Sequence, residues 1–391
     1  MTRPTTGWHF LQLPGPSNVP GRVLRALSRP TIDHRGPDFA DMAGEVLHGL
    51  RWIFRTGGPV VIYPSAGHGG WEAALVNTLD PGDKVLAFET GKFGVDWGKV
   101  ARELGFEAEI VSGDWRHGVN PRVVEERLTE DGDREIRAVL VLHNETSTGI
   151  VSPIPDIRRA MDRADHPALL LVDVISSLGS MEYRHDDWGV DVAVGASQKG
   201  LMLPPGLSFV AVGERALEAS RKSRASRSYW DWHPVIEANE EGLFPYTPAT
   251  NLLFGLRESL AMLREEGLER VFARHARHAA ATRRAVEAWG LEIQGVNADE
   301  HSDVLTAVRV PEGHDADRFR ALVRERFDLS LGGGLGKVRG RLFRIGHLGD
   351  FNDLMLAATL SGVESGLALA GIPVERGGAE AALRHLEQSD P

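Results

Sequence analysis

The sequence predicts an α/β protein with a large, mostly parallel sheet of about seven strands flanked by helices, followed by a smaller α+β domain. Three observations support this fold class. Short, nearly continuous apolar runs alternate with longer amphipathic segments between residues 60 and 210. β-branched residues and leucine dominate these runs, as expected for strands buried on both faces of a parallel sheet. Beyond Pro248 the pattern becomes mainly helical.

The N-terminal residues are expected to be extended, because prolines 14, 16 and 20 interrupt any regular helix. Two helical stretches follow, and Pro30 and Pro37 mark the break between them. The chain is therefore expected to divide into an N-terminal extended segment, a large domain and a small C-terminal domain, at residues 1–20, 21–249 and 250–391.

Seven apolar runs are predicted to be the strands of the large sheet, with helices such as 71–79 and 95–104 between them. Residues 217–245 lack a clear period and predict a long loop or a broken helix. The small domain is predicted to contain helices at 252–265 and 268–289 and strands at 302–310 and 342–345. The seven predicted strands are residues 60–62, 84–88, 108–111, 138–142, 168–172, 190–194 and 207–212.

Composition argues against several classes of protein. The formal net charge is −11 and no basic tract exists, which argues against nucleic-acid binding. The absence of cysteine excludes disulfides, thiolate chemistry and cysteine-ligated metals, and no metal site is expected. Residues 1–9 lack the basic and apolar regions of a signal peptide, and no run approaches the roughly 20 apolar residues of a membrane span. A cytoplasmic protein without a membrane partner is expected.

Two charged residues at predicted strand ends carry the strongest chemical signal. Only six of the 44 basic residues are lysines, and Lys199 ends the apolar run that begins at Val190. A lysine can serve as an amine nucleophile, whereas an arginine does not lose its proton. Asp173 follows five apolar residues at the end of another predicted strand, so both side chains are expected to face one crevice. Such a pair suits pyridoxal phosphate, because lysine holds the aldehyde as a Schiff base and aspartate keeps the pyridine nitrogen protonated.

Two polar loops also follow predicted strands. Residues 65–70 are small or polar and precede a helix at Trp71, so their N–H groups could bind an anion, although a plain strand-to-helix turn is equally compatible. Residues 143–149 form a polar cluster that is either functional or an array of caps and turns.

Two further residues have alternative interpretations. Arg344 lies inside an apolar strand, where it could pair with an acidic neighbour or hold a substrate carboxylate through both arms of its guanidinium. His34 lies between two predicted helices. On the residues alone, a surface turn is favoured there over a position in the crevice.

Together these motifs resemble the class V family of pyridoxal phosphate enzymes with the fold-type I architecture. The resemblance is closest to serine–glyoxylate aminotransferases and to aspartate– or 3-hydroxyaspartate–glyoxylate aminotransferases. The block around Lys199 with its partner Asp173 is specific, whereas the glycine-rich loop is not. The matching motifs run in order along nearly the whole chain, at residues 14–18, 31–35, 65–72, 143–149, 172–177, 195–206, 244–248 and 343–349.

The resemblance implies a role for each matching residue. Lys199 would bind pyridoxal phosphate covalently and move the α-proton, and Asp173 would pair with the pyridine nitrogen. Phe93 would stack on the cofactor ring, and Thr146 would lie near its O3′ oxygen. The other implied cofactor-binding residues are Ala66, Gly67, His68, Ile175, Gln198, Tyr246 and Thr247, and the implied substrate-binding residues are Arg344, Ser17, Asn18 and His34.

Two of these positions imply an assembly. In the family, residues at the positions of Tyr246 and Thr247 reach the phosphate of a neighbouring subunit, so the resemblance implies a homodimer and leaves a tetramer open. The implied reaction transfers an amino group from a small amino acid, with serine as the first choice, to glyoxylate. Aspartate or 3-hydroxyaspartate as donor stays open, as does a lyase acting on a hydroxyamino acid.

Two other enzyme classes are disfavoured. A cysteine desulfurase needs a cysteine that carries the persulfide, and the chain has none. A nucleotide-binding dehydrogenase needs a Gly-x-Gly-x-x-Gly turn after its first strand, and residues 65–70 are too compact for that turn.

Overall fold

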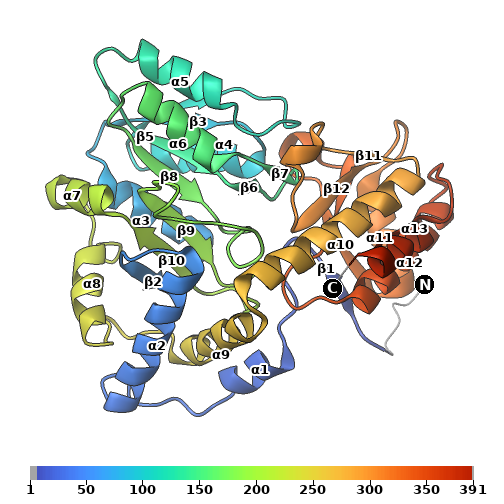
Figure 1. The fold of residues 1–391 in the computed structure, drawn as a ribbon, viewed down its shortest axis with the longest axis horizontal. Helices are drawn as coiled ribbons and strands as arrows, with labels where there is room; N and C mark the ends of the chain where they lie inside the picture. Colours follow the sequence, from blue (N-terminus) through green and yellow to red (C-terminus); the bar gives the residue numbers. More distant parts are fainter. Residues whose placement is uncertain (1–6, 390–391) are drawn as a thin grey trace.

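The computed structural model describes residues 7–389 of the 391-residue chain. The first six residues of the predicted N-terminal segment and the last two of the predicted small domain lie outside the described residues. Two sheets, each with its own helices, lie side by side, and the long helix α10 leads from the large-sheet half out along the small-sheet half (Figure 1). Among residues 7–389, no helix combines the length and apolar character needed to cross a membrane.

The larger sheet has seven strands in the order β2-β10-β9-β8-β5-β3-β4. Strand β10 runs antiparallel to its neighbours β2 and β9, and the other pairs are parallel. Each of the seven predicted apolar runs forms one of these strands, so the predicted mostly parallel α/β fold is confirmed. The strands are β2 (Val60–Tyr63), β3 (Lys84–Phe88), β4 (Glu107–Val111), β5 (Ile136–Leu142), β8 (Leu169–Asp173), β9 (Val192–Ala196) and β10 (Ser208–Val212).

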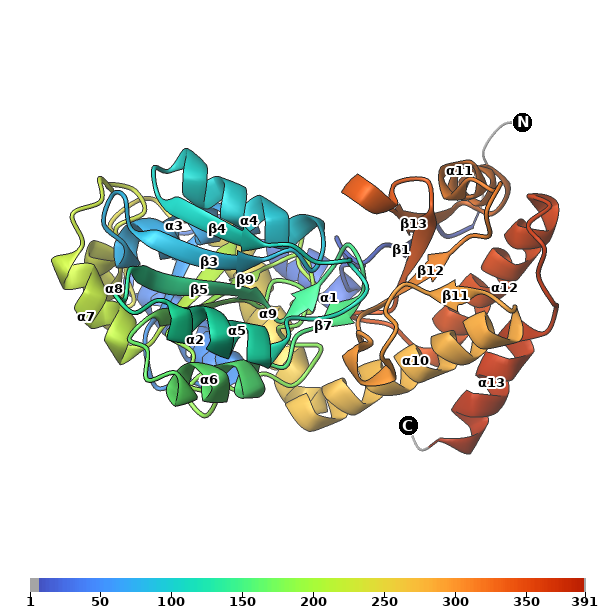
Figure 2. The ribbon, with the colours of Figure 1, turned by 90° about the horizontal axis from the view of Figure 1, so that it is seen from above.

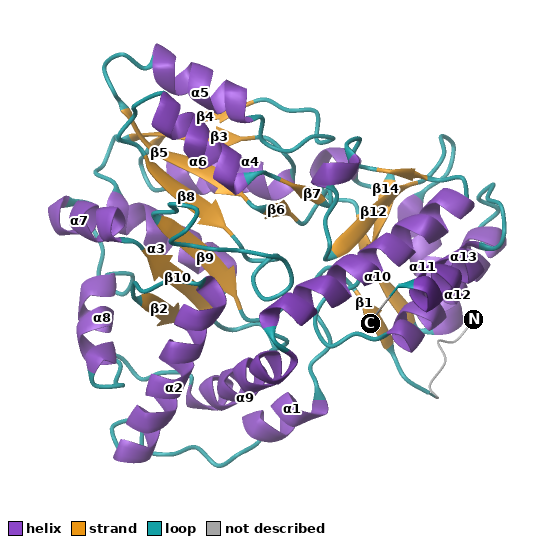
Figure 3. Cartoon of the chain, in the orientation of Figure 1, coloured by secondary structure: helices purple, strands orange, loops and turns teal. Residues whose placement is uncertain are grey.

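Helices cover both faces of this sheet (Figures 2 and 3). Alternate strand residues explain the unbroken apolar runs: Val60 and Ile62 pack into one core, and Val61 and Tyr63 pack into the other. One face is covered by α3 (Gly67–Thr78), α4 (Lys92–Glu103), α7 (Glu214–Lys222) and α8 (Trp232–Glu240). The other face is covered by α2 (Pro37–Phe54), α5 (Pro121–Glu130), α6 (Ile154–Arg163) and α9 (Thr250–Glu266).

The segment predicted as a loop or a broken helix, 217–245, contains α8 and the last six residues of α7, so the broken helix is the interpretation that holds. Asp231 caps α8 by accepting a hydrogen bond from the backbone N–H of His233. Within this nine-residue helix only Trp232 and Val235 are buried, which explains why the sequence has no clear helical period there.

The smaller sheet has five strands in the order β1-β13-β14-β12-β11. Strand β1 comes from the extended N-terminal segment and pairs in parallel with β13, so that segment is an edge strand of the small sheet. The strands are β1 (Phe10–Gln12), β11 (Glu292–Ile293), β12 (Leu305–Arg309), β13 (Leu329–Gly333) and β14 (Leu342–Gly346). The helices beside them are α10 (Leu268–Ala288), α11 (Ala316–Phe327), α12 (Asp353–Leu369) and α13 (Gly378–Gln388).

Helix α10 connects one core of the large sheet with the core of the small sheet. Its first residues, Leu268 and Val271, pack with the large sheet, whereas Ala285 and Val286 pack with the small sheet. The preceding helix α9 packs entirely with the larger core, although it lies beyond the predicted domain boundary at residue 250. The remaining elements are α1 (Gly21–Leu27) and the short strands β6 (Asn144–Glu145) and β7 (Ile150–Val151).

Candidate active site

The candidate site is a pocket at the carboxyl ends of the parallel strands, where α/β proteins bind ligands. The empty space in the pocket is about 520 Å³, which includes open solvent at its mouth. Nine of the predicted site residues line it, contributed by the segments that follow β2, β3, β5, β8 and β9. The lining residues are Ala66, Gly67, His68, Trp71, Phe93, Leu142, Asn144, Thr146, Asp173, Ile175, Gln198 and Lys199.

Lys199 is held by the N-terminal segment. Its Nζ donates a 2.7 Å hydrogen bond to the carbonyl oxygen of Pro14. Its own carbonyl oxygen accepts a 2.8 Å hydrogen bond from the Ser17 hydroxyl. Burial and the nearby charge of Arg344 lower the pKa of Lys199 to about 8, and the charge of Asp173 opposes this change. The amine therefore reaches its neutral, nucleophilic form much nearer to neutral pH than an ordinary lysine does.

Gly15 makes room for this amine. A Cβ atom at position 15 would lie 2.3 Å from Nζ of Lys199, which is too close for any packing. Gly15 also has a φ of +119°, a conformation that residues with a side chain rarely adopt. The backbone conformation therefore favours glycine at this position, and any side chain there would force the lysine amine to move.

Asp173 is a buried carboxylate with a donor on each oxygen. Its Oδ2 accepts a 2.9 Å hydrogen bond from Trp71 Nε1, and its Oδ1 accepts a 2.7 Å bond from the Ile175 N–H. Burial raises the pKa of Asp173 to about 7, with a further increase from Glu145, while the two hydrogen bonds and Lys199 act in the opposite direction. This carboxylate is suited to face a cation in the pocket, because a positive charge there would favour its ionised form.

The amino terminus of α3 forms another wall of the pocket. Ala66 is the N-cap residue, and no side chain caps the helix there. Gly67 packs so tightly that a Cβ atom would lie 2.3 Å from Cδ1 of Ile175. Uncapped backbone N–H groups at a helix amino terminus attract an anion. This geometry favours the anion-binding interpretation of residues 65–70.

The polar cluster at residues 143–149 serves both purposes that its sequence suggests. Thr146 lines the pocket. The buried carboxylate of Glu145 caps α4, because its Oε2 accepts hydrogen bonds from the backbone N–H groups of Phe93 and Gly94. Its Oε1 accepts from the N–H and the hydroxyl of Ser147. Glu145 therefore fixes the start of the helix that carries Phe93, which is a capping role of the kind that the sequence left open.

Arg344 lies in β14, where it is 8% exposed. Its Nε donates a 2.8 Å hydrogen bond to the carbonyl oxygen of Gly333, and its Nη1 donates a 2.7 Å bond to that of Thr146. Within residues 7–389 it forms no ion pair, so the interpretation as a partner of an acidic neighbour is wrong. Burial lowers the pKa of Arg344 to about 10, and the charge of Glu145 partly offsets this effect.

Three pocket residues were not predicted from the sequence: Trp71, Leu142 and Asn144. Leu142 ends β5 and reads as an ordinary strand residue, so no signal marked it. Trp71 and Asn144 follow strand ends within motifs that were already singled out, which is the signal that could have found them. Asn144 Oδ1 and Gln198 Oε1 are buried without a hydrogen-bond partner in the described part of the chain.

None of the four predicted substrate-binding residues lines this pocket. Ser17 holds the lysine backbone as described above, and its own N–H donates to the carbonyl oxygen of Gln198. The Asn18 side-chain amide donates to the carbonyl oxygen of Leu11. His34 is half-buried in the turn between α1 and α2. Arg344 contacts the pocket residue Thr146 through a hydrogen bond to its carbonyl oxygen.

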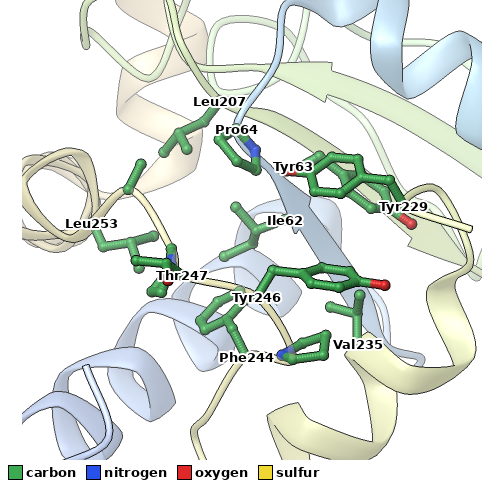
Figure 4. Close-up of a pocket in the computed structure, with 13 residues that line it drawn as sticks. Ile62, Tyr63, Pro64, Leu207, Tyr229, Val235, Phe244, Tyr246, Thr247 and Leu253 are labelled. Atoms are coloured by element: carbon green, nitrogen blue, oxygen red, sulfur yellow. The ribbon is translucent and has the colours of Figure 1, made fainter.

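Tyr246 and Thr247 lie in a separate pocket of mainly apolar and aromatic side chains (Figure 4). Tyr246 is 46% exposed and stacks on Tyr229, with ring centroids 5.3 Å apart. A single chain therefore does not bring these two residues to Lys199.

The mostly parallel sheet, the small domain and the pocket at the strand ends define the architecture of fold-type I pyridoxal phosphate enzymes. Residues 59–335 match the family model "Aminotransferase class-V", and the chain belongs to this family of aminotransferases. This membership overturns the dehydrogenase alternative.

Relatives named as aminotransferases resemble nearly the whole chain. It is 45% identical over 379 residues to the L-aspartate–glyoxylate aminotransferase of Paracoccus denitrificans, with 96% of each chain covered. It is 44% identical over 391 residues to the serine–glyoxylate aminotransferase of Methylorubrum extorquens, with 98% of this chain and 97% of that relative covered. Its structure matches pyridoxamine-pyruvate aminotransferase from Mesorhizobium loti with a TM-score of 0.93 at 30% identity, covering 99% and 100% of the two chains.

Proposed function

We propose that the protein transfers the amino group of serine to glyoxylate, giving glycine and the 2-oxo acid of the donor. The observation that carries this proposal is the single pocket that contains Lys199, Asp173 and the uncapped amino terminus of α3. The relatives from Paracoccus denitrificans and Methylorubrum extorquens are both named as glyoxylate aminotransferases, which supports glyoxylate as the acceptor.

The pocket residues fit pyridoxal phosphate. A lysine with a lowered pKa suits attachment to the aldehyde, and a buried carboxylate suits the pyridine nitrogen. The uncapped start of α3 suits the phosphate, and the unpaired Gln198 amide oxygen and Asn144 amide oxygen leave polar atoms for the cofactor. The residues that would hold the cofactor are Ala66, Gly67, His68, Phe93, Thr146, Asp173, Ile175, Gln198 and Lys199.

The side chains of this pocket would divide the proton chemistry between them. When bound, pyridoxal phosphate supplies a protonated pyridine ring that takes up the electron pair left when the donor loses its α-proton. Asp173 would keep that ring protonated. Lys199 would take the proton from Cα of the donor and later give a proton to Cα of the product glycine. General acid–base transfer of this kind contributes about 10²–10⁴-fold to a rate.

Arg344 would bind the α-carboxylate of the donor and the carboxylate of glyoxylate. Two of its nitrogens are anchored to the carbonyl oxygens of Gly333 and Thr146, while Nη2 donates to no acceptor among residues 7–389. An anchored guanidinium offers its remaining N–H groups in a fixed direction. Ser17 would act on the lysine backbone, and Asn18 on the N-terminal segment, instead of contacting the substrate carboxylate directly.

The charge of the pocket favours serine over aspartate as donor. An aspartate donor carries a second carboxylate, which needs a cation of its own when it leaves water. No arginine lines the pocket, Arg344 beside Thr146 would be occupied by the α-carboxylate, and Lys199 is required for the reaction. L-aspartate is the second candidate, because the relative from Paracoccus denitrificans, at 45% identity, is named for that donor.

We further propose a homodimer in which Tyr246 and Thr247 reach the pocket of the second copy. Both residues lie outside the pocket of their own chain, and Tyr246 is exposed. The cytoplasmic location expected from the sequence stays a prediction.

A donor screen tests the proposed reaction. Serine, aspartate, 3-hydroxyaspartate and alanine are each supplied with glyoxylate, and glycine is measured. Serine should give the highest kcat/KM, and Lys199→Ala should abolish product, whereas the exposed Lys99→Ala should leave the rate unchanged. With serine alone, the bound cofactor should convert to pyridoxamine phosphate. A protein that consumes serine continuously without glyoxylate would instead be a lyase.

A further inference from the structure

Two buried tryptophans stack on each other beside the pocket but differ in what their indole N–H groups contact. Trp71 of α3 and Trp97 of α4 have ring centroids 5.5 Å apart and an interplanar angle of 15°. Trp71 is 1% exposed and Trp97 is fully buried. Trp71 Nε1 donates to Asp173, whereas Trp97 Nε1 has no hydrogen-bond partner in the described part of the chain. Only one member of this pair is connected to the site by a hydrogen bond.

We propose that Trp71 is a positioning residue whose indole N–H orients the Asp173 carboxylate toward the pocket and stabilises its charge. This inference rests on the proposed function, in which Asp173 faces the pyridine nitrogen of the cofactor. Because the Ile175 N–H holds Oδ1 and Trp71 holds Oδ2, the carboxylate is held at both oxygens and cannot turn freely.

The surroundings of Trp71 keep its N–H in place. Trp97 packs against the indole, and the His68 ring lies 4.4 Å from it, centroid to centroid. Trp71 also belongs to α3, whose amino terminus is the proposed phosphate site. One rigid helix therefore carries both the phosphate site and the donor to Asp173, so their separation is set by helix geometry.

The hydrogen bond from Trp71 affects the charge of Asp173. Burial and Glu145 raise the pKa of the carboxyl to about 7, while Lys199, Ile175 and Trp71 oppose the increase. Near neutral pH the carboxyl therefore lies close to its midpoint, where the loss of one donor changes its charge strongly. Hydrogen bonds to a charged group in a buried site are stronger than those between neutral groups.

The test compares two matched substitutions, Trp71→Phe and Trp97→Phe. Each removes one indole N–H and keeps an aromatic ring, but only the first removes a bond to Asp173. The dissociation constant of pyridoxal phosphate is measured by absorbance at pH 6.5, 7.5 and 8.5. Trp71→Phe should raise it by about tenfold or more, with the largest effect at the lowest pH, because the carboxyl is then most easily protonated. Trp97→Phe should change it less than about twofold at every pH.

Equal dissociation constants for the two variants at all three pH values would overturn the inference and leave the proposed function intact. A wild-type protein that does not bind pyridoxal phosphate would overturn both. If Trp71→Phe does not fold, a second measurement on the wild-type protein still tests the inference. In the wild-type apoprotein, one indole N–H resonance should titrate with a midpoint near pH 7, and this titration should vanish in Asp173→Asn. If no indole resonance titrates, Trp71 does not sense the carboxylate and the inference fails.

Discussion

Arg344 and Thr146 join the two sheets across the edge of the pocket, because Nη1 of the arginine donates a 2.7 Å hydrogen bond to the threonine carbonyl oxygen. Arg344 belongs to β14 of the small sheet, and Thr146 directly follows the short strand β6, in the segment after β5 of the large sheet. Glu145, next to Thr146, caps the helix that carries Phe93. A carboxylate held by Arg344 would therefore lie beside the segment that positions the proposed cofactor-binding residues.

Replacing Arg344 by lysine should therefore lower kcat/KM for both serine and glyoxylate by about 10- to 100-fold, because the charge stays but the planar fork is lost. Steady-state kinetics with each substrate varied in turn measure this effect. Arg318→Lys, at an exposed position on α11, is the matched control and should behave like the wild type. An unchanged kcat/KM for Arg344→Lys would contradict the proposed carboxylate contact.

A methyl group at position 15 should displace the amine of Lys199 and prevent its bond to the cofactor. The Cβ of Gly15→Ala would lie 2.3 Å from Lys199 Nζ, so the amine must move and covalent cofactor binding should be lost. Gly105→Ala is the control, because Gly105 also has a positive φ (+89°) but has no neighbour within 4 Å of an added Cβ. Both variants should lose on the order of 1 kcal/mol of stability from backbone strain. Only Gly15→Ala should lose cofactor absorbance, and a normal spectrum for that variant would show that the lysine lies elsewhere.

The rate of cofactor uptake should depend on pH through Lys199. Its pKa is lowered to about 8, and only the neutral amine attacks an aldehyde. The uptake rate should therefore rise about tenfold per pH unit up to about pH 8 and level off above it. Stopped-flow absorbance between pH 6 and 9.5 measures this profile. A rate that continues to rise steeply up to pH 9.5 would indicate an ordinary, solvated lysine.

Mixing two inactive variants should reveal a shared site. Lys199→Ala removes the amine, and Thr247→Glu places a negative charge where a phosphate is proposed to bind. In a dimer with exchanged residues, each hybrid contains one intact site, so an equal mixture that re-equilibrates should regain about a quarter of the wild-type activity. Two preparations of Lys199→Ala, mixed in the same way, are the control and should stay inactive. If the mixture of the two different variants also stays inactive, Thr247 does not act in the site of a partner.

The pattern of apolar runs was sufficient to predict the large sheet. A strand that is buried on both faces has apolar residues at every position. Neighbouring residues such as Val60 and Val61 pack into different cores, so each unbroken apolar run forms such a strand. Contacts between distant segments were not predictable in this way. The pairing of β1 with β13 and the packing of α9 on the larger core depend on which apolar faces meet, and a local period does not encode that choice.

The sequence by itself determined that Lys199 and Asp173 stand at the ends of buried strands, because chain direction and strand ends can be read from apolar runs and the turns that follow them. Only the tertiary structure decided what surrounds them. The carbonyl oxygen of Pro14, the indole of Trp71 and the charge of Arg344 come from distant parts of the chain and set the direction and pKa of the two groups. Likewise, folding placed Tyr246 outside the pocket of its own chain, because three-dimensional packing, and not order along the sequence, determines which side chains share a cavity.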